Sequence, residues 1–134
     1  MCNGNGGGVF KSAMSGIENL ANAQMADAVS KGNAKTVRSV ARAEAEKIKR
    51  VGKSGASSAR AAAAENGVDV DVGSAAMIQD EHLGDAAFNA AMTVQDANYQ
   101  AQQIRAQGKM QRNSYGMKAA SDIISAGGQA MGWL

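Results

Sequence analysis

The sequence contains no proline, one cysteine and one histidine. Without proline, the strongest breaker of helices, the chain favours long uninterrupted helices. A single cysteine, Cys2, excludes an internal disulfide framework and is typical of a protein that folds in a reducing cytoplasm. His82 alone cannot supply the three or four ligands of a zinc site, and no base lies near Cys2 in the sequence. We therefore expect no enzymatic activity and no cofactor or metal ion.

Large apolar residues are also scarce. Leu, Ile, Val and Phe together make up only 20 of the 134 residues, about 15%. A packed monomeric core becomes doubtful when these residues fall below ~20% of the chain. Most other apolar residues are alanine, which favours helices but buries little area. No run approaches the ~18 consecutive apolar residues of a transmembrane helix. The composition predicts an all-α fold of long amphipathic helices, arranged as an extended helical hairpin or bundle and stabilised by oligomerisation.

The charge changes sign along the chain. Residues 31–60 contain nine basic and two acidic residues, whereas residues 65–96 contain seven acidic residues and no basic ones. Opposite charges favour two arms that lie antiparallel, within one chain or between copies. No base-reading motif is present, so any DNA contact would be non-specific contact with phosphates. The candidates for phosphate or partner contacts are Lys31, Lys35, Arg38, Arg42, Lys49, Lys53 and Arg60.

Glycine-rich stretches and charge divide the chain into segments. Residues 1–8 predict a flexible N-terminus without a signal peptide. Residues 9–134 predict a single elongated helical domain, with a break or kink at Gly32-Asn33. Its segments are a basic arm at about 31–64, a connector at 65–74, an acidic-to-basic arm at 75–112 and a C-terminal amphipathic helix at 113–134.

The connector has the residues of a helix end followed by a new helix start. Gly67 after Asn66 predicts a left-handed residue that ends the first helix. Residues 68–72 alternate apolar and acidic, which predicts a short extended segment, and Ser74 is a candidate N-cap. The two aspartates are expected to act as caps or as ion-pair partners between subunits. The connector residues of interest are Asn66, Gly67, Asp69, Asp71, Gly73 and Ser74.

Apolar residues recur with helical spacing along the arms. In the basic arm they average ~3.6 residues per turn, which predicts a straight or gently supercoiled helix. In the following arm they alternate in steps of four and three from Leu83 to Gly108, which predicts a heptad seam of mostly small residues.

Two apolar faces lie near the ends of the chain. Small residues spaced four apart and an aromatic residue at the rim of an apolar face are features of membrane-associating helices and also of helices that pack on partner proteins. The candidates for a membrane or partner face are Phe10, Met14, Ile17, Leu20, Met117, Ile124, Met131, Trp133 and Leu134.

Several segments together resemble a known family. The chain begins Met1-Cys2 and continues with Ala-rich helices; residues 60–70 read Arg-Ala-Ala-Ala-Ala-Glu-Asn-Gly-Val-Asp-Val, and residues 73–75 read Gly-Ser-Ala. Asp85 and then Ala97-Asn98-Tyr99 precede a helix rich in Gln and Arg. These features are similar to those of the small internal virion proteins, or ejection proteins, of short-tailed phages.

The resemblance implies a non-enzymatic protein that is packed in the virion and then released to form part of a conduit for the genome across the host envelope. Its implied partners are copies of itself, other virion core, portal or tail proteins, genomic DNA and the host outer membrane. Its implied location is the virion interior or the region near the tail, and after infection the host envelope. Two other hypotheses remain open: a static virion component at the portal or tail, and a DNA-packaging adaptor that binds DNA non-specifically.

Overall fold

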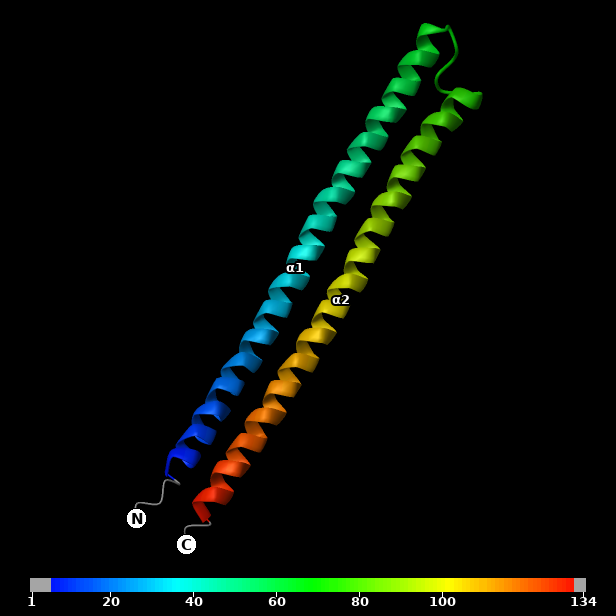
Figure 1. Cartoon of the computed structure of the whole chain (residues 1–134). Helices are drawn as coiled ribbons and strands as arrows, with labels where there is room; N and C mark the ends of the chain where they lie inside the picture. Colours follow the sequence, from blue (N-terminus) through cyan, green and yellow to red (C-terminus); the bar gives the residue numbers. More distant parts are fainter. Residues whose placement is uncertain (1–5, 132–134) are drawn as a thin grey trace. The chain divides into compact units, whose positions relative to one another are not determined.

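The structure is a computed structural model that describes residues 6–131. Two helices form it: α1 spans Gly6–Glu65 and α2 spans Gly73–Met131, and the described residues contain no strand. The helices pack against each other as an antiparallel hairpin (Figure 1). The predicted all-α hairpin is therefore confirmed, whereas oligomerisation stays a prediction.

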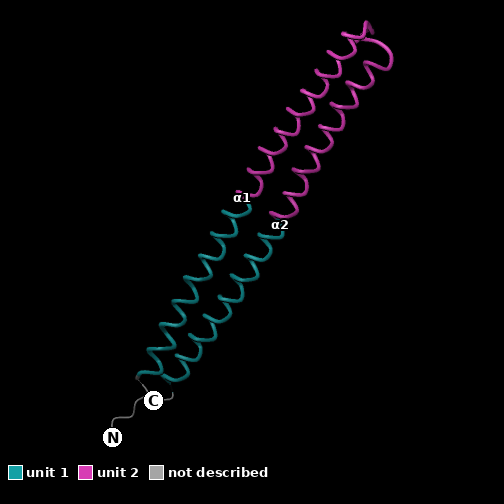
Figure 2. The backbone as a smooth tube through the Cα atoms, turned by 45° about the horizontal axis from the view of Figure 1, so that its top comes forward, with its two compact units in different colours: residues 1–34, 102–134 teal, residues 35–101 magenta. Residues whose placement is uncertain are grey.

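The chain divides into two compact units, each a stretch of α1 beside a stretch of α2 (Figure 2). The connector unit is Lys35–Ala101 and contains the turn between the helices. The terminal unit combines Met1–Ala34 with Gln102–Leu134, and its described residues are 6–34 and 102–131. Segments far apart in the sequence are thus neighbours in the terminal unit.

Two predicted interruptions of the first helix are absent from the described residues. α1 already includes residues 6–8, which were predicted to be flexible, and it passes through Gly32-Asn33 without a break. Gly8 lies close to α2, because a Cβ atom on it would come within 3.2 Å of Gln129 Oε1. Beside Gly32-Asn33, both Ser30 and Ala34 are buried. Residues 1–5 of the predicted flexible start lie outside the described residues.

Alanine fills the contact between the helices. Every buried apolar residue of the described chain is alanine, and no large side chain there is fully buried. Eight of the twelve buried alanines fall in two rows with intervals of eleven residues: Ala23, Ala34, Ala45 and Ala56 in α1, and Ala75, Ala86 and Ala97 in α2, followed by Gly108 and Ala119. The other four, Ala41, Ala90, Ala101 and Ala126, lie outside these rows. An eleven-residue interval corresponds to ~3.67 residues per turn.

The observed seam differs from the two predicted ones. In α2 the heptad prediction includes Ala90, Ala97 and Ala101, which are buried, but also Leu83, which is exposed. In α1, Val51, one of the regularly spaced apolar residues of the predicted basic arm, is also exposed. Close approach of the helices explains the difference, because a Cβ atom on Gly52 would overlap Ala86, and one on Gly108 would overlap Ser30. Large side chains such as those of Val51 and Leu83 therefore point away from the contact.

The turn between the helices follows the predicted pattern at its first half. Gly67 has a φ of +72°, its N–H bonds to Ala64 O at 3.0 Å, and the N–H of Val68 bonds to Ala63 O at 3.0 Å. These bonds form a Schellman motif, so the prediction of a left-handed Gly67 is confirmed. The Asn66 side chain adds a bond to Ala62 O at 2.8 Å.

The second half of the turn differs from the predicted cap. α2 begins at Gly73, whose φ is +67°, so Ser74 lies inside the first turn and is not the residue before it. Asp69 Oδ1 accepts a bond from the N–H of Asp71 at 3.0 Å, which is the bond of an Asx turn. Gln79 donates to Val70 O at 2.8 Å and so attaches the turn to α2.

Candidate assembly surfaces

Six basic residues form one row on the α1 stretch of the connector unit, which we call the basic ridge. They are Lys35, Arg38, Arg42, Lys49, Lys53 and Arg60. Steps of three, four and seven residues keep them within about 60° of one another around the helix axis. The seventh predicted candidate, Lys31, continues the same row of α1 in the terminal unit. The structure thus brings the predicted basic residues together on one side of one helix.

The charges of the two arms do not neutralise each other across the connector unit. All residues 35–101 are described, and they form two ion pairs: Lys49–Glu46 at 3.4 Å within α1 and Arg60–Asp71 at 3.0 Å at the turn. Arg38 bonds to the amide oxygen of Asn98 at 3.2 Å. The arms are antiparallel, as predicted, but the acidic residues of α2 do not pair with the basic residues of α1. Pairing of opposite charges between α1 and α2 is therefore not what holds the helices of the connector unit together.

The connector unit has a shallow groove along its alanine seam, on the side away from the basic ridge. Around α1 the ridge and the groove residues lie roughly 70–100° to either side of the buried alanines. Val37, Val40, Ile48 and Val51 supply the apolar wall from α1. From α2 the lining residues are His82, Ala86, Asn89, Thr93, Asp96, Ala97 and Gln100. Glu44 lines both halves of the groove and joins them, and Lys47 of α1 is a basic residue in the same lining.

The predicted apolar faces of the terminal unit point to solvent. Phe10 is 68% exposed and Ile124 is 74% exposed. The other described members of the two faces are also exposed: Met14, Ile17, Leu20, Met117 and Met131. Trp133 and Leu134 lie outside the described residues. The contact between the helices uses another side of α1, where a Cβ on Gly16 would come within 3.2 Å of the Ile123 side chain. The hairpin itself leaves the two apolar faces uncovered.

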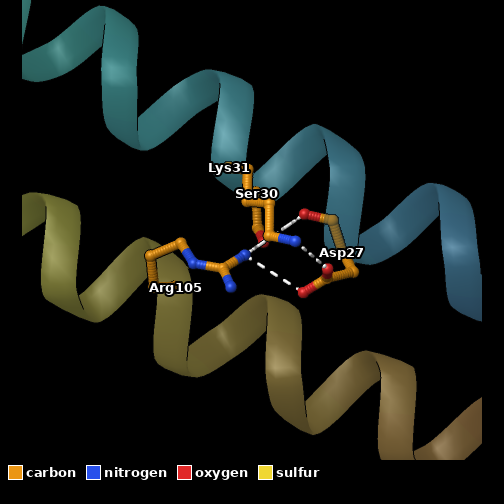
Figure 3. A network of polar contacts seen from close by, with 4 residues as sticks. All are labelled: Asp27, Ser30, Lys31 and Arg105. Carbon is orange, nitrogen blue, oxygen red and sulfur yellow. Dashed lines mark hydrogen bonds and ion pairs between the residues drawn. The ribbon is translucent and has the colours of Figure 1, made fainter.

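A polar cluster of Asp27, Ser30, Lys31 and Arg105 joins the two helices of the terminal unit (Figure 3). Arg105 Nη1 donates to Ser30 Oγ at 2.6 Å, to Asp27 Oδ1 at 3.1 Å and to Asp27 O at 3.2 Å. Lys31 Nζ lies 2.9 Å from the other carboxylate oxygen of Asp27. The hydrogen bond from Lys31, and then that from Arg105, lower the pKa of the Asp27 carboxyl against the opposing effect of desolvation. Asp27 is therefore held in its charged form.

A second polar contact lies nearer the chain ends. Asp122 Oδ2 of α2 accepts bonds from Ser15 Oγ at 2.8 Å and from Asn19 Nδ2 at 2.9 Å. Neither Asp122 nor Arg105 was among the residues predicted from the sequence. The signal was present, because Asp122 is the only acidic residue among the largely apolar residues 113–134.

No protein-family model, curated protein or solved structure matches this chain. None of the helices in residues 6–131 is long and apolar enough to cross a membrane. The described residues contain no group of three His, Cys, Asp or Glu side chains that could hold a metal ion.

Proposed function

We propose that this protein is an internal virion protein of a short-tailed phage, released at infection to form part of a conduit for genome translocation across the host envelope. Segment 60–75 supports the proposal, because it resembles the corresponding segment of that family. In this proposal the protein lies in the virion interior or near the tail and then in the host envelope. Its partners are copies of itself, other core, portal or tail proteins, genomic DNA and the host outer membrane.

The observation that carries the assembly part of the proposal is the distribution of apolar side chains. The buried apolar residues of the described chain are all alanine, while 21 large apolar residues are exposed. Burial of apolar surface stabilises a protein by ~25 cal/mol per Å², so a hairpin of this kind gains more by covering its outer faces than by its own seam. Copies of the chain, partner helices or a lipid surface could supply that cover.

The location of the protein before and after genome release tests the proposal. The protein should be present in intact virions and lost from emptied particles. Retention in emptied particles would instead support a static component at the portal or tail. This second hypothesis is favoured by the same exposed faces, because partner helices in a fixed assembly would also cover them.

Dye release from lipid vesicles tests the membrane step separately. The wild-type protein should release dye, and Ile124→Asp should lower the release by about tenfold or more, because a carboxylate is costly in hydrocarbon. Met110→Asp is the matched control, since Met110 is an exposed residue of the same helix outside the two predicted faces. Equal loss of release in both variants, or no release by the wild type, would contradict the membrane step.

A further inference from the structure

We propose that copies of this chain associate front to back through the connector unit, with the basic ridge of one copy packed against the groove of the next. This inference rests on the self-assembly in the proposed function and names the surfaces that carry it. The occupant of the groove is thus a second copy of the same chain.

Unpaired charges on the ridge and the groove favour a second copy as the partner. The connector unit contains eight basic and nine acidic residues, so it is nearly neutral, yet its charges are segregated. Lys35, Arg42 and Lys53 of the ridge form no ion pair within residues 35–101, all of which are described. Glu44, Asp85 and Asp96 also form none there, and Glu44 and Asp96 line the groove, whose lining holds one basic residue, Lys47. A second copy supplies both signs of charge at once.

The apolar wall of the groove favours a protein as the partner. Val40 and Val51 are 62% and 65% exposed although they lie beside the alanine seam. A nucleic acid would neutralise the ridge but would leave these valines and the groove carboxylates uncovered. A second copy covers the valines and pairs the carboxylates, so the observations favour protein over nucleic acid as the partner.

The acidic residues of α2 and the basic residues of the ridge have matching separations along their helices. Asp85 and Asp96 are eleven residues apart on α2, about 16.5 Å at ~1.5 Å per residue. Three pairs of ridge residues have the same separation: Arg38 and Lys49, Arg42 and Lys53, Lys49 and Arg60. Eleven residues correspond to just over three full turns, so both members of each pair point the same way. Asp85 lies outside the groove lining but on the same side of α2 as Asp96, so a ridge laid along the groove can meet both aspartates together.

The proposed contact uses two different surfaces of each copy. Every added copy therefore presents a free ridge at one side and a free groove at the other. Interfaces of this heterologous kind produce closed rings when the rotation between copies closes, and filaments when it does not. A symmetric dimer, which uses the same surface on both copies, is not expected.

Two charge-reversed full-length variants test the inference by sedimentation velocity over a concentration series. The ridge variant combines Lys35→Glu, Arg42→Glu and Lys53→Glu, and the groove variant combines Glu44→Lys, Asp85→Lys and Asp96→Lys. Each alone should raise the dissociation constant for self-association by about tenfold or more, because like charges then face each other. An equimolar mixture should restore association, because the reversed ridge complements the reversed groove. Far-ultraviolet circular dichroism verifies that both variants remain helical.

If a triple variant does not fold, two single-residue variants test the same contact. Arg42→Glu removes a ridge charge, whereas Arg50→Glu makes the same charge change at an exposed residue of the same helix outside the ridge. Only Arg42→Glu should weaken association, and added salt should reduce the difference between the two.

The other outcomes overturn the inference in distinguishable ways. Association that survives ridge reversal, together with lost binding of a labelled DNA duplex, would identify the ridge as a nucleic-acid surface. A mixture that fails to associate would exclude front-to-back contact. A wild-type protein that stays monomeric would contradict both this inference and the proposed self-assembly. Front-to-back association of a protein that is retained in emptied virions would leave the inference standing and overturn the proposed release.

Discussion

The two units use the same alanine seam but fix their helices in register differently. In the terminal unit, side chains of α1 bond across to Arg105 and Asp122 of α2. In the connector unit, the cross-helix side-chain bonds are that from Arg38 to Asn98 and the ion pair from Arg60 to the turn. The turn itself sets the register there, because it joins the helices covalently. Alanine seams carry little register information, so the unit without a turn needs specific polar bonds.

The largest effect is expected where the helices of the connector unit come closest. Gly52→Ala should lower the free energy of unfolding by about 1–3 kcal/mol, because its Cβ atom overlaps Ala86. Gly84→Ala is the matched control, since nothing lies within 4 Å of a Cβ atom there. It should raise stability by roughly 0.5–1 kcal/mol through helix propensity. Urea unfolding followed by circular dichroism measures both, and equal shifts would contradict the close approach.

The next effect directly compares the two units. Arg105→Met should lower the free energy of unfolding by about 1–2 kcal/mol, because it removes charge-assisted bonds to partly buried groups. Arg38→Met removes one exposed bond in the connector unit and should cost about 0.5 kcal/mol or less. Hydrogen exchange should show the loss of protection from Arg105→Met mainly in the terminal unit. A larger loss of unfolding free energy for Arg38→Met than for Arg105→Met would contradict the stronger dependence of the terminal unit on polar bonds.

A substitution at the turn tests whether the connector sets the register of its unit. Gly67→Ala places a Cβ atom at a φ of +72° and should cost about 1 kcal/mol. Gly67→Asn should cost less, because asparagine tolerates the left-handed conformation. The difference between their midpoints of thermal unfolding measures this strain. Identical midpoints would indicate that the Schellman turn is not limiting.

The smallest effect is the acid sensitivity of the terminal unit. The pKa of Asp27 in the folded protein lies below its ordinary value of 3.8, so the charged carboxylate stabilises the fold above that value. This contribution is lost as the pH falls through the lowered pKa of the folded state. Asp27→Asn should therefore flatten the loss of stability in acid, as followed by thermal unfolding at successive pH values. An unchanged acid profile would contradict the role of the polar cluster.

The sequence predicted the hairpin and its turn because both depend on strong local signals. The change of charge sign, the lack of proline and the Asn66-Gly67 pair mark where two long helices meet. The eleven-residue seam was not predicted, because alanine is so common that several periods fit the same helix. A heptad interpretation includes Leu83 with Ala90, yet the close approach of the helices leaves no space for a leucine.

The polar bonds of the terminal unit were also not predicted. They join residues more than 70 positions apart, and single polar residues have no periodicity to reveal them. The one indication of such a bond in the sequence was an isolated charge, such as Asp122, within a largely apolar helix. The basic ridge could be predicted, because its spacing follows from one helix alone. The absence of ion pairs between the ridge and the acidic residues of α2 within residues 35–101 could not be predicted, since it depends on how the second helix is rotated.

The all-alanine seam has a thermodynamic consequence. The heat capacity increase on unfolding comes mainly from exposure of apolar surface, about 12–15 cal/mol/K per residue in ordinary globular domains. A hairpin whose buried apolar residues are all alanine in its described part, and which already exposes 21 large apolar residues when folded, exposes little new apolar surface. The free energy of unfolding of the isolated hairpin should therefore vary unusually little with temperature. Cooling should lower it only slightly. A large heat capacity change in calorimetry would then report the dissociation of assembled copies.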